Sequence, residues 1–249
     1  MSLLVLSDAH LSGPDDPALH GLCARLARAP AEAVALLGDL LHAGWTWRKP
    51  SLNDDVIHAV LGAVGPRPLY ICPGNHDFGL RWPARRQGAP RTVAAAHTLT
   101  VHGRRLLLVH GDLADRRPGY RLLRPILRGA PFRALIGAAG PRRGQRWLDR
   151  LAGAPGADPD RVDGELVGLQ RHWGQAQLQA SVADIIFQGH SHHFGAEGAP
   201  GGQLVWTGAW LGRQASVEVD AEGVHLCTGV AGRRLPAPPA RSPTVGGAP

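Results

Sequence analysis

Five short polar clusters stand out in the sequence because their side chains could hold metal ions or move protons. Each contains aspartate, asparagine or histidine, and each directly follows a short apolar run. In an open α/β sheet, the segments that follow the strands meet at one edge, where ligands and catalytic groups gather. We therefore expect one site built from Asp8-Ala9-His10, Gly38-Asp39, Gly74-Asn75-His76-Asp77, His110-Gly111-Asp112 and Gly189-His190-Ser191-His192.

The donors in these clusters suit a pair of metal ions. Asp8 and His10 are two positions apart, so an extended chain would direct both side chains to the same side, and His190 and His192 repeat this spacing. Imidazole, carboxylate and amide donors together favour Mn²⁺, Fe or Zn²⁺ over Mg²⁺. A metal pair needs a shared ligand. Asp39 is the natural bridge, because it stands alone after its glycine and is central in strand order.

The residues alone leave two roles open. Asn75, His76 and Asp77 stand in a row, and either the histidine or its amide neighbour could be a metal ligand. Asp112 could support a ligand from the second layer, or it could be a turn carboxylate that accepts backbone N–H groups. His193 adjoins a candidate ligand pair, but strand alternation directs it to the other face, so we leave it out of the site.

Aromatic and histidine residues outside these clusters are expected to have ordinary structural roles. Trp45 and Trp47 follow the Asp39 segment, and packing is a better interpretation for them than a substrate groove. The remaining histidines are expected to be surface or packed residues rather than ligands: His20, His42, His58, His97, His102, His172 and His225.

Apolar runs and helical spacing predict the elements that must position the clusters. Helices are expected over 18–29 and over 51–63, where Ser51 is a plausible N-cap. Alternation of strands and helices in the first third of the chain implies right-handed crossovers and a partly parallel sheet, hence an α/β fold. Strands are expected over 3–6, 33–37, 69–72, 98–101, 106–109, 185–187, 203–207, 215–219 and 224–227.

The middle of the chain, about 113–180, breaks this pattern and is interpreted as an inserted helical cap. It belongs to one domain spanning 1–230. Within the cap, residues 152–164 are expected to form a mobile loop. The segment 231–249 is rich in Pro and Gly and is expected to be a disordered tail.

The positive charge of the protein is concentrated in the cap. Residues 116–150 contain ten arginines and one acidic residue, which gives +9, against +7 for all 249 residues. Such a segment suits anionic lipid, a phosphorylated substrate or nucleic acid. Aromatic residues are sparse in it, which makes nucleic acid the least favoured partner. One alternative is a basic helix face that is merely solvated. Leucine beside arginine at helical spacing favours instead an anionic membrane surface, to which the cap would present Leu122, Leu123, Ile126 and Leu127.

Cysteine usage and hydropathy bear on the compartment. The three cysteines are widely spaced and form no CxxC motif, which suits a reducing environment. No stretch approaches the ~18 consecutive apolar residues that a membrane span needs. We therefore expect a cytoplasmic protein that could associate with the membrane from the cytoplasmic side.

Taken together in this order, the five clusters resemble the calcineurin-like metallophosphoesterase superfamily. The resemblance covers residues 3–112 and 184–228. It implies a two-sheet sandwich flanked by helices, here with an inserted helical cap. It also implies two metal sites, with Asp39 shared between them. The first would be held by Asp8, His10 and His192, and the second by Asn75, His110 and His190.

The same resemblance implies roles for the two residues that follow Asn75. His76 would not be a ligand but would face the scissile phosphate, and Asp77 would orient it. The chemistry implied is hydrolysis of a phosphate ester, in which a water activated by the metal pair attacks phosphorus in line.

One branch of the superfamily is most similar, the UDP-2,3-diacylglucosamine pyrophosphatases of lipid A synthesis. The similarity rests on Gly119-Tyr120-Arg121 after His110-Gly111-Asp112, on the basic helical insertion and on Gly208-Ala209-Trp210. It implies release of UMP and 2,3-diacylglucosamine 1-phosphate, with Tyr120, Leu123 and Arg124 as substrate contacts. Two alternatives are a phosphoesterase acting on another nucleotide, phosphodiester or phosphoprotein, and a non-enzymatic membrane or nucleic-acid binding module with a structural metal.

Overall fold

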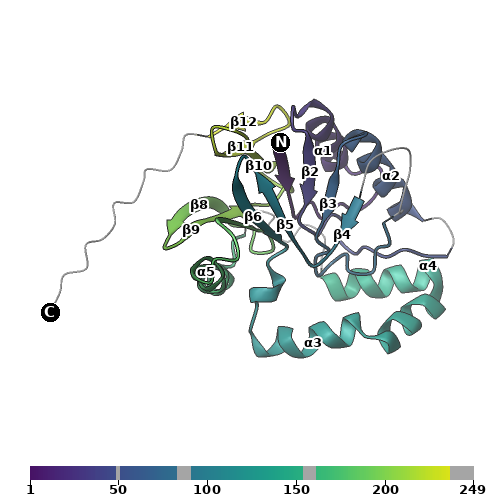
Figure 1. The fold of residues 1–249 in the computed structure, drawn as a ribbon. Helices are drawn as coiled ribbons and strands as arrows, with labels where there is room; N and C mark the ends of the chain where they lie inside the picture. The colour runs from purple at the N-terminus through teal and green to yellow at the C-terminus, as the bar shows by residue number, and fades with distance from the viewer. Residues whose placement is uncertain (49–50, 83–90, 154–160, 236–249) are drawn as a thin grey trace.

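The computed structural model describes residues 1–48, 51–82, 91–153 and 161–235. Within this part of the chain, two β-sheets pack face to face, with helices on both outer faces (Figure 1). This is the α/β sandwich expected from the sequence. The cap helices lie beyond one end of the sheets.

The first sheet has the described strand order β12-β11-β10-β1-β2-β3-β4. From β1 to β4 neighbouring strands are parallel, and β10 runs antiparallel to β1. The parallel part therefore places the ends of β1, β2 and β3 at one edge. The strands are β1 (Leu3–Leu6), β2 (Ala33–Leu36), β3 (Leu69–Ile71), β4 (Arg91–Val93), β10 (Ala215–Val219), β11 (Val224–Thr228) and β12 (Arg233–Arg234).

The second sheet has the described order β5-β6-β7-β9-β8. Its central strands β6, β7 and β9 are parallel, and the outer strands β5 and β8 are antiparallel to their neighbours. The ends of β6 and β7 face the same edge as those of β1 to β3. The strands are β5 (Ala96–Val101), β6 (Arg104–Val109), β7 (Ile185–Gln188), β8 (Phe194–Ala199) and β9 (Gly202–Thr207).

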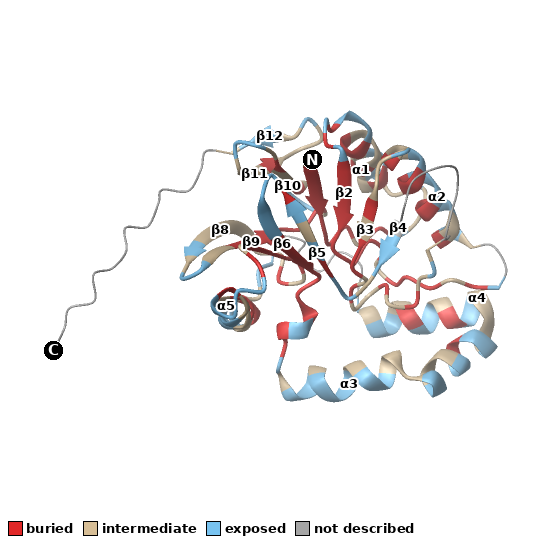
Figure 2. Cartoon of the chain, viewed as in Figure 1, coloured by how far each residue is buried: buried red, intermediate tan, exposed pale blue. Residues whose placement is uncertain are grey.

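The central strands are apolar on both faces because each face is covered. In β1, Leu3 and Val5 pack between the two sheets, whereas Leu4 and Leu6 face helices α1 (Pro17–Arg28) and α2 (Leu52–Val64). Asp16 caps α1 by accepting a hydrogen bond from the Ala18 N–H at 2.9 Å. Figure 2 shows the resulting contrast between buried strands and exposed outer helix faces.

The region expected to form the cap divides into two parts. Helices α3 (Pro118–Arg128) and α4 (Ala130–Ala152) lie beyond the strand ends, but α5 (Gly164–Gln179) covers the outer face of the second sheet. Val167 and Leu178 of α5 are buried against Leu107 and Leu204 of that sheet. The projecting cap is therefore shorter than the predicted 113–180.

Helix α4 is held by an aromatic cluster that follows the Asp39 segment. Trp45 and Trp47 are buried against Ile136 and Leu148 of α4, which confirms their interpretation as packing residues. The helix bends at Gly140, where φ is 71°. This cluster keeps α4 beside the edge at which the polar residues lie.

Several boundaries differ from the sequence predictions. The edge strands β4 and β8 and the short strand β12 were not anticipated. Of the expected mobile loop, residues 154–160 lie outside the described residues, while Ala152 and Gly164 are helix ends. The start of the expected tail is ordered, because β12 pairs with β11, and Arg234 forms an ion pair with Glu218 at 3.4 Å. Residues 236–249 lie outside the described part.

Candidate metal centre

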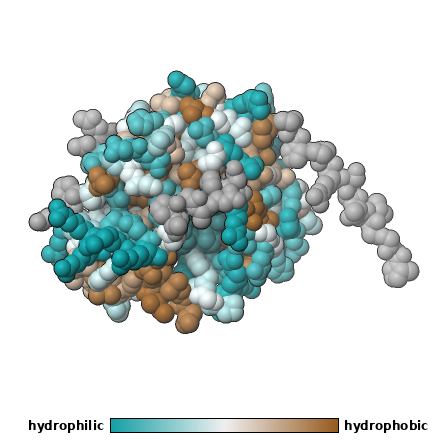
Figure 3. All heavy atoms as spheres, turned by 180° about the vertical axis from the view of Figure 1, so that it is seen from behind, coloured by the Kyte–Doolittle hydropathy of each residue, from teal (hydrophilic) through white to brown (hydrophobic). Residues whose placement is uncertain are grey.

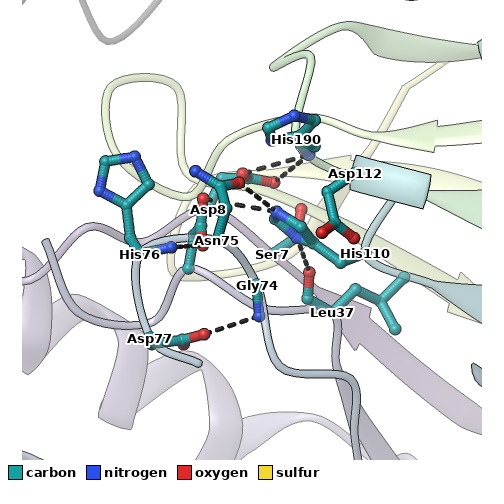
Figure 4. Close-up of polar contacts among 12 residues, drawn as sticks. Ser7, Asp8, Leu37, Gly74, Asn75, His76, Asp77, His110, Asp112 and His190 are labelled. Atoms are coloured by element: carbon teal, nitrogen blue, oxygen red, sulfur yellow. Dashed lines mark hydrogen bonds and ion pairs between the residues drawn. The ribbon is translucent and has the colours of Figure 1, made fainter. Parts of the chain in front are cut away.

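The five polar clusters do converge, at the edge where β1, β2, β3, β6 and β7 end (Figure 4). In two groups of three residues, the potential ligand atoms all lie within 4.8 Å of one another. The first group is Asp8, His10 and His192, and the second is Asp39, His110 and His190. These six side chains, all named from the sequence, therefore meet at one edge of the sheets.

Asp39 lies between the two groups. Its Oδ2 atom is 3.4 Å from His110 Nε2 and 4.0 Å from His10 Nε2. The Oδ1 atom of Asn75 joins the second group, 3.1 Å from His110 Nε2. A single buried carboxylate thus reaches both sets of donors, as the sequence interpretation of Asp39 requires.

The reason given above for the convergence of the Asp-x-His and His-x-His pairs is wrong. These residues are not in extended backbone: the φ angles of Asp8, His10, His190 and His192 are 53°, 45°, 66° and 56°. The backbone of Asp39 is also in the left-handed region, with φ at 52°. Such backbone is uncommon outside glycine and costs free energy, and it occurs preferentially at functional sites. Sharp turns, rather than strand alternation, bring these side chains together.

Two glycines in the clusters are required by close approach of carboxylates. A Cβ atom on Gly74 would lie 2.0 Å from Asp39 Oδ1, and one on Gly189 would lie 2.5 Å from Asp8 Oδ2. Both positions would clash with the acidic residue of a neighbouring segment. Any larger residue there would displace a candidate ligand.

The donor atoms are arranged as a cation would require. His190 Nε2 is buried, makes no hydrogen bond among the described residues and lies 3.9 Å from Asp115 Oδ2, an arrangement that is costly unless another group satisfies it. His10 Nε2 and His192 Nε2 lie 3.2 Å apart. At that distance the two imidazole nitrogens can share only one hydrogen, so one of them presents a lone pair. The residues present therefore fit divalent metal ions.

Buried charges in the centre shift one another's pKa values. Burial lowers the pKa of His10 to about 4, so its imidazole is unprotonated near neutral pH, as a metal ligand must be. Burial also acts to lower the pKa of His110, but Asp39 outweighs it and raises the pKa to about 10. Burial acts to raise the pKa of Asp39, but the neighbouring histidines outweigh it and hold this pKa well below its usual range. Metal would displace the proton on His110.

Backbone contacts orient the candidate ligands. The Nδ1–H of His110 is donated to the Leu37 carbonyl at 2.6 Å, which directs Nε2 toward Asn75 and Asp39. The His190 N–H is donated to both carboxylate oxygens of Asp8, at 3.0 and 3.2 Å. Because metal-ligating histidines are usually held through their second nitrogen, the His110 arrangement suits a ligand.

The predicted contact between Asp77 and His76 is not made. Asp77 is buried and accepts hydrogen bonds from the N–H groups of Gly74 at 2.7 Å and Leu40 at 2.9 Å, pointing away from the His76 ring (Figure 4). The His76 Nδ1–H is instead donated to the carbonyl of His42 at 2.7 Å. Asp77 therefore shapes the loop, and a backbone carbonyl orients His76.

His42 was not expected to lie at this site. Besides holding His76 through its carbonyl, it has a ring nitrogen within 4.8 Å of those of His10 and His76. Its Nε2 also lies 3.2 Å from the carbonyl of Gly153, at the end of α4. His42 lies three residues after Asp39, in the segment that follows β2. That position could have indicated from the sequence that His42 lies at the site. His193, in contrast, packs on Trp206 with ring centroids 5.2 Å apart, as expected.

Asp112 contacts the cap rather than a backbone turn. Its Oδ2 atom accepts hydrogen bonds from the Tyr120 hydroxyl, Arg124 Nε and an Arg128 Nη. Tyr120 and Arg124 are thus held close to the centre, and the Tyr120 ring lies 5.8 Å from that of His190. Arg128 was missed, although Tyr120, Arg124 and Arg128 are spaced by four and must share one face of a helix.

A cavity of about 200 Å³ lies between the cap and the centre. Asn75 and His76 stand at its polar end, and Tyr120, Leu123 and Arg124 line it together with Arg128. All three predicted substrate residues therefore lie at one cavity. The rest of the wall is apolar, with Phe78, Leu127, Phe132, Leu148 and Leu151.

A model of the calcineurin-like phosphoesterase family matches residues 1–194, which include every candidate ligand described above. The chain belongs to this family. It is therefore a hydrolase, and divalent metal ions are implied for the candidate centre. The alternative of a purely non-enzymatic binding module is set aside.

Two curated relatives of this calcineurin-like phosphoesterase share one name with each other. UDP-2,3-diacylglucosamine hydrolase of Edwardsiella ictaluri (strain 93-146) is 27% identical over 262 residues, covering 98% of this chain and 96% of the relative. The enzyme of that name from Stenotrophomonas maltophilia (strain K279a) is 28% identical over 249 residues, covering 92% and 98%.

A solved structure supports the fold. An archaeal phosphodiesterase matches 92% of this chain and 99% of its own with a TM-score of 0.51 and 13% identity. That likeness concerns the arrangement of sheets and helices alone. Among the described residues, no helix is both long enough and apolar enough to cross a membrane.

Proposed function

We propose that this phosphoesterase hydrolyses UDP-2,3-diacylglucosamine to UMP and 2,3-diacylglucosamine 1-phosphate. The observation that carries the proposal is the largely apolar cavity that begins beside Asn75 and His76 and runs under the cap. A substrate held there needs a phosphate at one end and apolar chains at the other. The names of the relatives describe such a molecule.

The proposed metal assignment follows the two groups of donors. Asp8, His10 and His192 would hold the first ion, and Asn75, His110 and His190 the second, with Asp39 shared. The mixture of imidazole, carboxylate and amide oxygen favours Mn²⁺, with Fe or Zn²⁺ as alternatives. When bound, two such ions supply an activated water and neutralise charge on the phosphate oxygens.

The reaction proposed is an in-line displacement at the uridine-side phosphorus. A water oxygen forms the new bond to this phosphorus, and the bond to the oxygen between the two phosphorus atoms breaks. That oxygen leaves with the sugar phosphate. A phosphate is a good leaving group, so protonation of the leaving oxygen contributes less here than it would with an alkyl ester.

His76 is the proposed catalytic side chain. The hydrogen bond from its Nδ1–H to the His42 carbonyl leaves Nε2 available, and the residue lines the polar end of the cavity. Its role would be to contact phosphate oxygens as charge develops on them. Asp77 would contribute indirectly, by holding in place the loop that carries Asn75 and His76.

We also propose a cytoplasmic location with the cap resting on an anionic membrane surface. Leu122 and Ile126 of α3 are 70% and 55% exposed. They are accompanied by exposed arginines on the cap, at 116, 121, 142, 143, 146 and 150. A peripheral position of this kind would give the cavity direct access to an acylated substrate.

The deciding experiment is incubation of the protein with Mn²⁺ and UDP-2,3-diacylglucosamine, followed by detection of UMP. Release of UMP that is abolished by EDTA and restored by Mn²⁺ is expected. UDP-N-acetylglucosamine, which lacks the acyl chains, should be hydrolysed much more slowly because it leaves the apolar cavity empty. Hydrolysis of bis(p-nitrophenyl) phosphate without any UMP release would refute the proposed substrate and indicate another phosphate ester.

A further inference from the structure

Helix α3 forms one wall of the cavity although none of its residues is buried. Helices of globular proteins are normally held by an apolar face that packs against the core. The exposed leucine and isoleucine side chains of α3 cannot supply this. Its position must therefore depend on a small number of other contacts.

Most polar contacts between α3 and the sheets converge on one atom. Asp112 Oδ2 accepts from the Tyr120 hydroxyl at 2.9 Å, from Arg124 Nε at 2.9 Å and from an Arg128 Nη at 3.1 Å. The three donors are one helical turn apart, so they form a single row along the face of α3 that looks toward the metal centre. Asp112 itself is 4% exposed.

The remaining polar contacts of α3 are few. At its N-cap, Arg117 forms ion pairs with Asp115 and with Asp163, which precedes α5. The others belong to the same row. The Arg128 Nη also donates to the Gly74 carbonyl at 3.1 Å, and the guanidinium lies 5.7 Å from the centroid of the Phe78 ring. Charge-assisted hydrogen bonds to a buried carboxylate are stronger than neutral ones. Beyond the N-cap, Asp112 thus accepts most of the polar contacts that attach the body of the helix.

We propose that Asp112 is a positioning residue that sets the affinity for the apolar part of the substrate by holding α3 as a wall of the cavity. This inference takes its substrate from the proposed function. Asp112 follows the candidate ligand His110 by two residues, so the anchor of the cap is part of the segment that carries the centre. The position of the cavity wall is thereby fixed relative to the metal ions.

The test compares Asp112→Asn with the parent protein on two substrates. We expect KM for UDP-2,3-diacylglucosamine to rise roughly 10- to 100-fold, as for the loss of charge-assisted hydrogen bonds, with little change in kcat. Hydrolysis of bis(p-nitrophenyl) phosphate and the bound metal content should stay within about threefold of the parent. Asp149→Asn, which changes a cap carboxylate bonded to Gln145 and not to α3, is the matched control.

Hydrogen exchange of residues 118–128 gives a readout that needs no substrate. We expect faster exchange of this segment in Asp112→Asn than in Asp149→Asn, with the strands unchanged. Arg124→Gln should have a similar but smaller effect, and adding it to Asp112→Asn should contribute little more, because both act on one contact.

Two outcomes would overturn the inference. One is unchanged exchange of α3. The other is an equal loss of both activities together with metal, which would assign Asp112 to the support of His110. Failure of the parent protein to release UMP would refute the proposed function, whereas the exchange result would still decide whether Asp112 holds the helix.

Discussion

At the scale of single residues, neighbours in the chain act in different places. Asn75 points to the second group of donors, His76 stands at the polar end of the cavity, and Asp77 is buried against backbone N–H groups. An amide oxygen is neutral, so Asn75 offers a ligand without adding to the negative charge of Asp8 and Asp39. Three consecutive polar residues thus divide into a proposed ligand, a proposed substrate contact and a support for the loop.

The first prediction separates binding of metal from turnover. His76→Ala should retain the same metal content as the parent and lose roughly 100-fold or more in kcat, as for a positioned group at the reacting phosphate. Asn75→Ala should lose one of the two ions, because an amide ligand is removed. Elemental analysis of the purified variants, alongside initial rates, decides this. Loss of an ion in His76→Ala would show that the two roles are reversed.

At the scale of elements, the candidate ligands depend on five strand ends remaining in register. The parallel strands β1, β2 and β3 are joined by α1 and α2, so the packing of these helices positions Asp8, Asp39 and Asn75. Arg67 lies where both helices end. Its guanidinium donates to carbonyls at the end of α2 (Ala63 and Val64) and to three near the end of α1 (Leu26, Ala29 and Ala31).

The prediction at this scale concerns stability. Helix C-terminal carbonyls lack intrahelical partners, and a cation there interacts favourably with the helix dipole. Arg67→Met should therefore lower the free energy of unfolding by about 1–3 kcal/mol, measured by urea denaturation, with kcat unchanged. Arg67→Lys should lower the free energy of unfolding by a smaller amount. Arg105→Met, which removes an exposed ion pair with Asp184 and a hydrogen bond to the Ser181 carbonyl, should lower the free energy of unfolding much less. Equal effects at positions 67 and 105 would contradict the proposed clamp.

At the scale of the whole molecule, the arginines of the cap divide into two sets. Arg117, Arg124 and Arg128 point inward and form ion pairs with Asp112, Asp115 or Asp163, and Arg133 lies 5.6 Å from the Trp45 ring centroid. The others are exposed beside apolar side chains. Figure 3 shows this combination as a hydrophobic patch along the lower edge of the molecule, next to hydrophilic residues.

The prediction at this scale tests the membrane surface. The protein should cosediment with vesicles containing phosphatidylglycerol at low salt, and binding should weaken as salt screens the arginines. Replacing both Leu122 and Ile126 by serine should reduce binding further. Val182→Ser is the control, because Val182 is 39% exposed and lies just before the start of β7, at the end of the sheet opposite the cap. Equal binding to neutral vesicles, or none to anionic ones, would refute this part of the proposal.

Much of this arrangement could be predicted from local pattern. The main strands are short apolar runs, and α1 and α2 have helical periodicity; their expected and observed bounds agree to within a residue or two. The edge strand β4 was missed because its hydrogen bonds are made to β3, 22 positions earlier in the chain. The edge strand β8 pairs with the next strand, β9, but its own sequence pattern is weak. β8 contains two glycines and alanines and has little apolar character of its own.

By itself, the sequence determined which donor residues are available and that each follows a buried strand. That information is local, because hydrophobic runs and the polar residues after them are written consecutively. Only the tertiary structure decided where the side chains point. Left-handed turns direct Asp8, His10, His190 and His192 inward. The carbonyl of His42 takes the place expected for Asp77, and Asp112 binds a helix rather than a turn. These outcomes depend mainly on contacts between different elements, such as that of His76 with His42, which the spacing within one segment does not encode.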